Sequence, residues 1–337
     1  MQLRGTLQSG LKKLLENQVP SAQLAAELLL MHVLAYDRSF LYSHPEKEIP
    51  QETVDRYFAL IAERATGKPT QYITGHQEFW GLDFEVTPQV LIPRPETEHV
   101  VETVLELIER QGSPKDARLR IVDVGTGSGC IALALASELP RAILFGVDIS
   151  RTALVVASTN AVRLGMPERV KFMESDLLAR FLDDDFLGTF DFVVSNPPYV
   201  SRDELDKVQR EVRDFEPRVA LGDLASNDEI YRRLFPEALR VLKRGGHIVV
   251  EIGYNMRDAV VALLTGNVAT GLSPADMGAR ASCPLAAETA ALPIADLQVG
   301  ATSSWTDVEV MPDLRGIPRM VRARKKQEPE VRSQESE

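Results

Sequence analysis

A rigid strand end is the part of this sequence best suited to chemistry: FDFVVSNPPY at positions 190–199. Its apolar, aromatic and β-branched residues predict a strand. Pro197 and Pro198 must end that strand, because proline has a fixed φ and no N–H to donate to a sheet. Asn196 precedes a proline and is therefore favoured in extended geometry. The alternative reading is an ordinary strand followed by a Pro-Pro turn.

The groups at this strand end suit a planar NH2 group. The Asn196 side chain and the Pro197 carbonyl can accept its two hydrogens, while Tyr199 can cover its flat face. We therefore expect Asn196, Pro197, Pro198 and Tyr199 to bind the substrate. Asn196, Pro197 and Tyr199 are also the expected catalytic residues. The chemistry expected of such a slot is methyl transfer to an amide or amino nitrogen.

A glycine-rich turn, DVGTGSG at positions 123–129, follows an apolar run and precedes a helical pattern. Its glycines permit a tight turn and let a ligand approach the backbone closely. The spacing is not the G-x-G-x-x-G of dinucleotide sites, and the lysine of a P-loop is absent. A ligand without phosphate, such as S-adenosylmethionine, is therefore favoured. Its expected binding residues in this turn are Asp123, Gly125, Thr126, Gly127, Ser128 and Gly129.

Polar side chains also follow the next two predicted strands. Asp148 ends one of them, where a carboxylate can accept both ribose hydroxyls, although it could instead cap the following helix. Asp176 ends the other, where it could accept from the adenine amino group, and Leu177 could pack on the adenine ring. Ligands bind at the carboxyl ends of parallel strands. The sequence therefore predicts one cofactor pocket that contains these residues and Asn196.

Composition limits the class of protein. The chain has 337 residues and is 44% hydrophobic, which is enough for a core and two domains. Its net charge of -11 argues against nucleic acid as the default partner. Cys130 and Cys283 lie far apart and the histidines show no ligand spacing, so we expect neither a disulfide scaffold nor a metal site. Without a signal peptide or membrane-span pattern, we expect a cytoplasmic protein.

Two regions must position the chemical groups. Residues 1–75 carry leucines at helical spacing and predict a helical bundle, in which Ser21 is a candidate N-cap. Such a bundle could dock a substrate or could simply pack against the rest of the chain. Residues 76–96 predict a hairpin and a linker. The PRPETE stretch at 93–98 could line the cofactor pocket or could only begin the next helix.

Residues 97–325 alternate strands with helices, which predicts an α/β domain with a parallel, doubly wound sheet. A helix over 229–242 is expected to end at Gly245-Gly246, which would suit a C-cap and turn. Within this domain, residues 266–303 are rich in Ala, Thr, Ser, Gly and Pro without a clear period, and predict a flexible insertion. The charged tail, 326–337, is predicted to be disordered.

Several of these motifs together resemble the HemK/PrmC family of protein-(glutamine-N5) methyltransferases. The stretches that carry the resemblance are the glycine turn, NPPY at 196–199, QYITG at 71–75, EFWG at 78–81, PRPETE at 93–98, EIG at 251–253 and DLRGIPR at 313–319. The NPPY motif is shared with DNA adenine methyltransferases and does not separate the two groups. The PRPETE stretch looks like the release factor-specific branch, not the branch that modifies ribosomal protein L3.

The resemblance implies a Rossmann-like S-adenosylmethionine-dependent methyltransferase sheet with a small N-terminal helical substrate-docking domain. It also implies the substrate, which is the glutamine of the GGQ motif in class I peptide chain release factors, and so a role in translation termination. A DNA or RNA adenine-N6 methyltransferase, an L3 glutamine methyltransferase and a non-enzymatic scaffold that binds the cofactor are the alternatives. The chain departs from the family pattern at 266–303 and at Leu177, where some relatives carry an aromatic residue.

Overall fold

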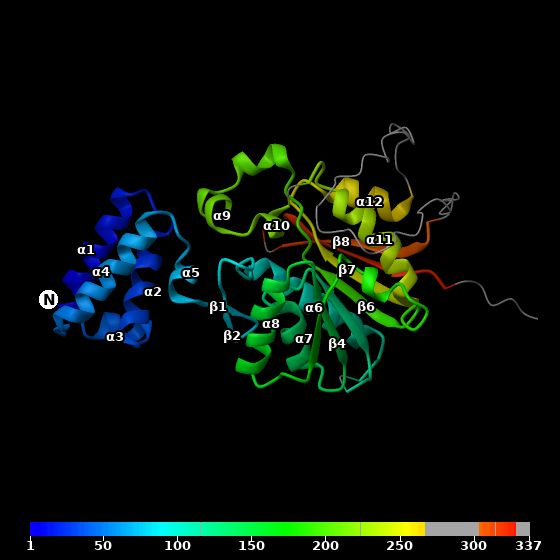
Figure 1. The fold of residues 1–337 in the computed structure, drawn as a ribbon, viewed down its shortest axis with the longest axis horizontal. Coiled ribbons are helices and arrows are strands. Elements are labelled where there is room, and N and C mark those ends of the chain that lie inside the picture. The colour runs from blue at the N-terminus through cyan, green and yellow to red at the C-terminus, as the bar shows by residue number, and fades with distance from the viewer. Residues whose placement is uncertain (115, 223, 267–302, 314, 328–337) are drawn as a thin grey trace, which may run out of the picture.

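In Figure 1 the computed structural model describes residues 1–114, 116–222, 224–266, 303–313 and 315–327. The expected insertion and the expected disordered tail therefore fall almost wholly outside the described residues. A helical bundle near the N-terminus lies at one end of the long axis, and a larger sheet with helices on both faces makes up the rest. No described helix combines the length and the apolar composition that a membrane span requires.

The N-terminal part of the chain is helical, as the leucine spacing predicts. Its helices are α1 (Leu3–Glu16), α2 (Ala22–Leu34), α3 (Arg38–Ser43), α4 (Gln51–Ala65) and α5 (Thr70–Thr74). Their apolar faces meet in one buried cluster around Leu29 and Tyr57. Ser21 precedes α2 as expected, but its side chain makes no capping hydrogen bond. The short helix α3, which periodicity did not predict, is capped by Asp37, whose Oδ1 accepts from the Phe40 N–H at 2.8 Å.

A hairpin and an extended linker connect this bundle to the sheet. Strands β1 (His76–Phe79) and β2 (Leu82–Glu85) pair antiparallel, and Gly81 at their turn has a φ of +70°. Arg94 is extended, with φ -102° and ψ 143°, as its flanking prolines predict. The 3-10 turn η1 (Pro95–Thr97) then leads directly into α6 (Glu98–Arg110).

Seven strands form the main sheet in the order β5-β4-β3-β6-β7-β9-β8 among the described residues. Their bounds are β3 (Arg120–Val124), β4 (Ile143–Asp148), β5 (Val170–Glu174), β6 (Phe190–Ser195), β7 (Leu242–Glu251), β8 (Trp305–Pro312) and β9 (Pro318–Lys325). The first five are mutually parallel. Strands β4 and β5 are therefore added on one side of β3, and β6 and β7 on the other side, as in doubly wound folds.

The prediction of a parallel sheet is wrong at the edge formed by β9 and β8. Strand β9 runs antiparallel to β7, and β8 runs antiparallel to β9. Only residues 313–317 join β8 to β9, and a parallel pair requires a much longer crossover. The sheet is therefore mixed, while its Rossmann-like character and its helical cover are as expected.

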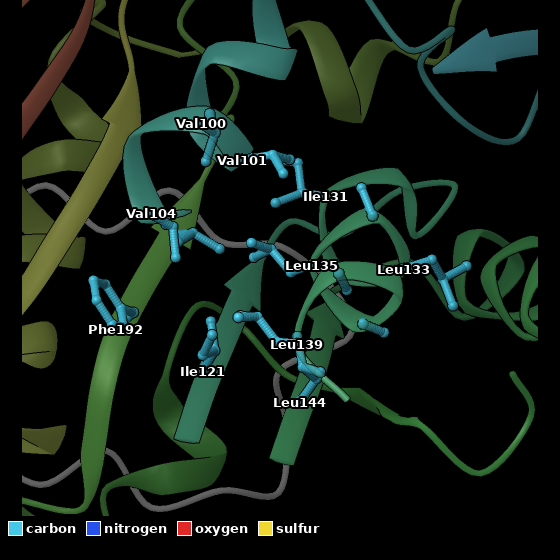
Figure 2. Packing of buried hydrophobic residues seen from close by; sticks show 14 of the residues in the cluster. Val100, Val101, Val104, Ile121, Ile131, Leu133, Leu135, Leu139, Leu144 and Phe192 are labelled. Atoms are coloured by element: carbon cyan, nitrogen blue, oxygen red, sulfur yellow. The ribbon is translucent and has the colours of Figure 1, made fainter. Parts of the chain in front are cut away.

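Helices cover both faces of the sheet. The described helices of this part are α7 (Cys130–Glu138), α8 (Arg151–Arg163), α9 (Arg210–Phe215), α10 (Arg218–Leu221), α11 (Glu229–Val241) and α12 (Arg257–Thr265), with 3-10 turns η2 (Ala179–Phe181) and η3 (Arg202–Lys207). On one face, α6 and α7 direct Val104 and Leu135 toward Ile121 of β3 (Figure 2). Val122, the next residue of that strand, belongs to the cluster under α11 and α12. The strand is thus apolar on both faces because both are buried.

Gly245 and Gly246 correct a second prediction. Helix α11 ends at Val241, and both glycines lie inside β7 and not at a C-cap. The β6–β7 register jumps between Phe190 and Phe192, so this part of β7 bulges. Gly245 has a φ of +78°, and a Cβ on Gly246 would lie 3.1 Å from the Phe190 carbonyl oxygen. The bulge therefore favours glycine at both positions, through the positive φ of Gly245 and the close backbone contacts of Gly246.

Candidate active site

The ends of four neighbouring strands carry the residues that the sequence singles out. In the register of the sheet, Val124 of β3 pairs with Val147 on one side and with Ser195 on the other. The glycine turn that follows Val124 therefore lies between Asp148 and Asn196 at the same edge. Because strand order reverses at β3, this edge is the place where doubly wound folds bind ligands.

The glycine turn is held by backbone hydrogen bonds and leaves one side open. The N–H groups of Gly125 and Thr126 donate to the Val147 carbonyl oxygen at 2.8 and 2.9 Å. Gly125, Gly127 and Gly129 have φ values of +71°, +55° and +82°, which favour glycine. Apart from the residues next to it in the chain, no described residue has an atom within 4 Å of a Cβ placed on Gly125, whereas a Cβ on Gly129 would lie 3.2 Å from three side chains. The first part of the turn therefore gives access to a ligand, and its last glycine packs.

Asp123 is a buried carboxylate with one oxygen still to be satisfied. Its side chain is 1% exposed, and Oδ2 accepts from the Thr126 hydroxyl at 2.7 Å and from the Ala132 N–H at 3.3 Å. Oδ1 is buried and has no hydrogen-bond partner among the described residues. Burial raises the pKa of Asp123 to about 7, against the opposing effect of the hydrogen bonds from Thr126 and Ala132. An ammonium group of a ligand would supply both the missing donor and the opposite charge.

Asp148 is tied to the glycine turn. Its Oδ2 accepts from the Gly127 N–H at 2.9 Å, and its Oδ1 accepts from the Ser150 N–H at 2.9 Å. The side chain of Ser150 accepts from the Ala153 N–H, so Ser150 is the N-cap of α8 and Asp148 is not. Each Asp148 oxygen has a second lone pair, so the carboxylate can still accept from the hydroxyl groups of a ligand.

Asp176 and Leu177 lie just beyond the end of β5, as expected from the sequence. The Asp176 side chain is exposed and pairs with Arg233 of α11, with Nη2 and Oδ2 2.7 Å apart. Leu177 adopts a φ of +49° and packs against the cluster under α11 and α12. Arg233 was not singled out from the sequence, because a helical arginine 57 residues away gives no local signal.

Asn196 is anchored on its nitrogen side by a buried hydrogen-bond chain. Its Nδ2 donates to Thr97 Oγ1 at 2.9 Å, and that hydroxyl donates to Glu251 Oε2 at 2.7 Å. Thr97 and Glu251 are each 2% exposed. They come from η1 and from the end of β7, inside the PRPETE and EIG motifs. Those motifs were the only signal for them, and sequence reasoning assigned neither residue a role.

Tyr199 packs against the buried cluster on the α11 side of the sheet. Burial raises the pKa of its hydroxyl, so the ring stays neutral near pH 7. A Cβ on Gly253 would lie 3.3 Å from Tyr199 Cδ2, which places the ring against the backbone after β7.

The segment after the NPPY motif links this edge to the N-terminal helices. Buried Arg64 of α4 forms an ion pair with Glu211 of α9. Arg210 donates through Nη2 to the Thr66 carbonyl oxygen at 3.1 Å. Arg94 pairs with Glu216, whose pKa is raised by burial and lowered by that guanidinium.

The sheet order, the glycine turn after β3 and the polar groups at the strand ends define a Rossmann-like methyltransferase. Family models support this class. The PrmC N-terminal domain matches residues 6–75, and the methyltransferase small domain matches residues 104–213.

The similar proteins give the family. A release factor glutamine methyltransferase of Koribacter versatilis is 43% identical over 325 residues, which cover 96% of this chain and 99% of the relative. The same enzyme of Nitratidesulfovibrio vulgaris is 40% identical, covering 78% and 86%. The chain belongs to the release factor glutamine methyltransferase family, so the resemblance stated from its motifs is confirmed.

A solved structure supports the fold alone. The catalytic domain of human METTL16, in complex with a MAT2A 3′UTR hairpin, matches with a TM-score of 0.50 at 15% identity, covering 81% of this chain and 83% of that one.

Proposed function

We propose that this enzyme transfers a methyl group from S-adenosylmethionine to the side-chain amide nitrogen of the glutamine in the GGQ motif of class I peptide chain release factors. The relatives' names support the substrate. The observation that carries the proposal is the Asn196 side chain, anchored through its own nitrogen beside the glycine turn. Such a substrate would place the enzyme in the cytoplasm.

S-adenosylmethionine fits the residues at this edge of the sheet. Asp123 Oδ1 would accept from its ammonium group, Asp148 would accept from the ribose hydroxyls, and the open backbone at Gly125 and Gly127 would admit the ligand. Thr126 would hold the Asp123 carboxylate in place. Asp176 and Leu177 remain the proposed contacts for adenine. When bound, the cofactor supplies an electrophilic methyl group on a sulfonium sulfur.

The protein's part in the reaction is positioning and electrostatics. An amide nitrogen is a weak nucleophile because its lone pair is delocalised into the carbonyl. Asn196 Oδ1 and the Pro197 carbonyl oxygen would accept both N–H hydrogens of the substrate, which fixes the nitrogen and raises its electron density. Pro198 would keep this corner rigid, and the Tyr199 ring would cover the amide plane. No general base is needed before transfer, because the nitrogen loses its proton readily once methylated.

We also propose that the helical region, residues 1–75, docks the protein substrate. Its support is the contact between α4 and the segment that follows the NPPY motif, made by Arg64 with Glu211 and by Arg210 with Thr66. A protein bound to these helices would therefore lie next to the segment that continues from the NPPY motif. The domain layout expected from the sequence would then have a functional reason.

A direct test offers three substrates side by side with methyl-labelled cofactor: a class I release factor, ribosomal protein L3 and DNA. The proposal predicts label in the release factor alone. A release factor with its GGQ glutamine replaced by alanine is the control and should take up no label. Label in L3 or DNA instead of the release factor would contradict the proposal.

A further inference from the structure

The hydrogen bond between Thr97 and Asn196 bears on the orientation of the Asn196 amide as well as on its position. Both residues are members of one chain of hydrogen bonds that ends on Glu251. We propose that Thr97 and Glu251 are positioning residues that fix the orientation of the Asn196 amide, so that its oxygen and not its NH2 group faces the substrate. This inference rests on the proposed function above.

The orientation of the Asn196 amide follows from where the protons of this chain lie. An ionised Glu251 carboxylate can only accept, so the single hydroxyl proton of Thr97 goes to Glu251 Oε2. The hydroxyl oxygen then has only lone pairs to offer to Asn196. Asn196 must therefore turn its NH2 group toward Thr97, and its Oδ1 points to the opposite side of the amide. A substrate NH2 group needs an acceptor there, and a flipped amide would offer a second donor instead.

Among the described residues, the Thr97 hydroxyl has no capping partner in its own helix. Thr97 stands at the N-cap position of α6, yet its side chain makes no capping hydrogen bond. Its two contacts reach residues 99 and 154 positions away in the sequence. The Tyr231 hydroxyl donates to the Glu251 carbonyl oxygen at 2.8 Å and so holds the end of β7 in place.

Burial makes this arrangement costly, which argues for a role beyond joining two elements. A buried carboxylate costs several kcal/mol unless it is well paired, and Glu251 Oε2 has the hydroxyl of Thr97 as its side-chain donor. Burial raises the pKa of Glu251 to about 7, against the opposing effect of the Thr97 hydrogen bond. The charged and titratable groups that interact electrostatically with Glu251 are Arg319, Glu96, Arg94, Tyr199 and Tyr231.

Protonation of Glu251 would remove the direction of the chain. A carboxylic acid can donate to Thr97, and the Thr97 hydroxyl can then donate to Asn196 Oδ1, which turns the NH2 group toward the substrate. Turnover should therefore fall as the pH drops through about 7. A glutamine at position 251 would have the same ambiguity at every pH.

The first test compares Thr97→Val with Thr97→Ser on a release factor substrate. Valine keeps the shape of threonine but removes the hydroxyl, so kcat should fall about 10-fold to 100-fold, while the calorimetric affinity for cofactor stays within about twofold. Serine restores the hydroxyl and should recover most of the lost rate. Thr103→Val is the matched control, because Thr103 is also a buried threonine of this region and donates to Met311 Sδ, away from Asn196. It should keep the wild-type kcat.

The second test measures the pH dependence of kcat in Glu251→Gln with cofactor saturating at every pH, so that the weaker cofactor binding expected at low pH does not contribute. The wild type should lose rate below about pH 7, and the variant should be slower but without this acid limb. A purely structural role would lower the melting temperature and leave the limb unchanged. This test also decides the matter if Thr97→Val does not fold.

The two proposals fail in distinguishable ways. If the wild type does not methylate the release factor, the proposed function is wrong. If the wild type is active but folded Thr97→Val keeps its kcat within about twofold, the positioning role is overturned. An acid limb that persists in Glu251→Gln would overturn it as well.

Discussion

Ser195 of β6 pairs with Val124 of β3, and its buried hydroxyl donates to the Val124 carbonyl oxygen at 2.6 Å. The glycine turn begins at the residue after Val124, and Asn196 follows Ser195. The distance between the proposed cofactor loop and Asn196, the proposed substrate-binding residue, is therefore set by one pair of neighbouring residues in the parallel sheet. Central strands of this kind are the most rigid part of an α/β domain.

Asp148→Ala should weaken cofactor binding before it affects anything else. The substitution removes the proposed acceptor for the ribose hydroxyls and also frees the Gly127 N–H, so we expect a loss of about 1 to 3 kcal/mol in binding free energy. Isothermal calorimetry with S-adenosylmethionine measures this directly. Wild-type affinity in the variant would count against the ribose contact.

Cofactor affinity should rise with pH through about 7. The free protein holds Asp123 with a pKa near 7, whereas an ammonium group beside it would favour the ionised form. Below that pH the carboxyl must first lose its proton, and affinity should fall by up to about tenfold per pH unit. Calorimetry from about pH 5.5 to about pH 8 checks this, with Asp123→Asn as the control that should bind weakly and without the pH dependence. A flat wild-type profile would contradict the ammonium contact.

The stability of the protein without cofactor should change with pH in the opposite sense. The folded-state pKa of Asp123 is raised from 3.8 to about 7, so the folded protein binds a proton that the unfolded chain has lost. The stabilising contribution is present below pH 4 and is lost as the pH rises to about 7, by up to about 1.4 kcal/mol per pH unit. When unfolding in urea is measured across this range, the free energy of unfolding should change less steeply with pH in Asp123→Asn than in the wild type. The dependence that remains in the variant would come from Glu251.

Asn160→Ala should destabilise the fold by about 2 to 4 kcal/mol. Buried Asn160 accepts from the Glu85 N–H and donates to the carbonyl oxygens of Glu85 and Ser128, so it joins the hairpin to the glycine turn. Its loss leaves these groups unpaired. The matched control is Asn17→Ala, because exposed Asn17 donates only to the Lys13 carbonyl oxygen among described residues. Equal unfolding free energies for the two variants would contradict this role.

The sequence was informative where local pattern decides structure. The apolar runs before Asp148 and Asn196 predicted where these two strands end. A short apolar run that stops at a polar residue or a proline is typical of a buried strand. The short helix α3 has too few residues for a period to be visible. Gly245 and Gly246 were misassigned because a C-cap and a bulge can both use the left-handed conformation, which Gly245 adopts.

Strand direction and contacts between residues far apart in the sequence could not be predicted from local patterns. The short connection between β8 and β9 accounts for the antiparallel pairing of those two strands, but apolar alternation does not encode the direction of β9 relative to β7. The hydrogen bond of Thr97 with Glu251 joins residues 154 positions apart, and only the folded sheet brings them together.

The Asn196 carboxamide is the group proposed to hold the substrate amide, and the proposed reaction depends on it. The measurement that tests it most directly is single-turnover methyl transfer to a class I release factor by Asn196→Ala, with cofactor affinity measured on the same preparation. We expect the rate to fall by about 100-fold or more while cofactor affinity changes little, since a contact made in the transition state is lost and the glycine turn is kept. A folded Asn196→Ala enzyme that methylates the release factor at the wild-type rate would contradict the account.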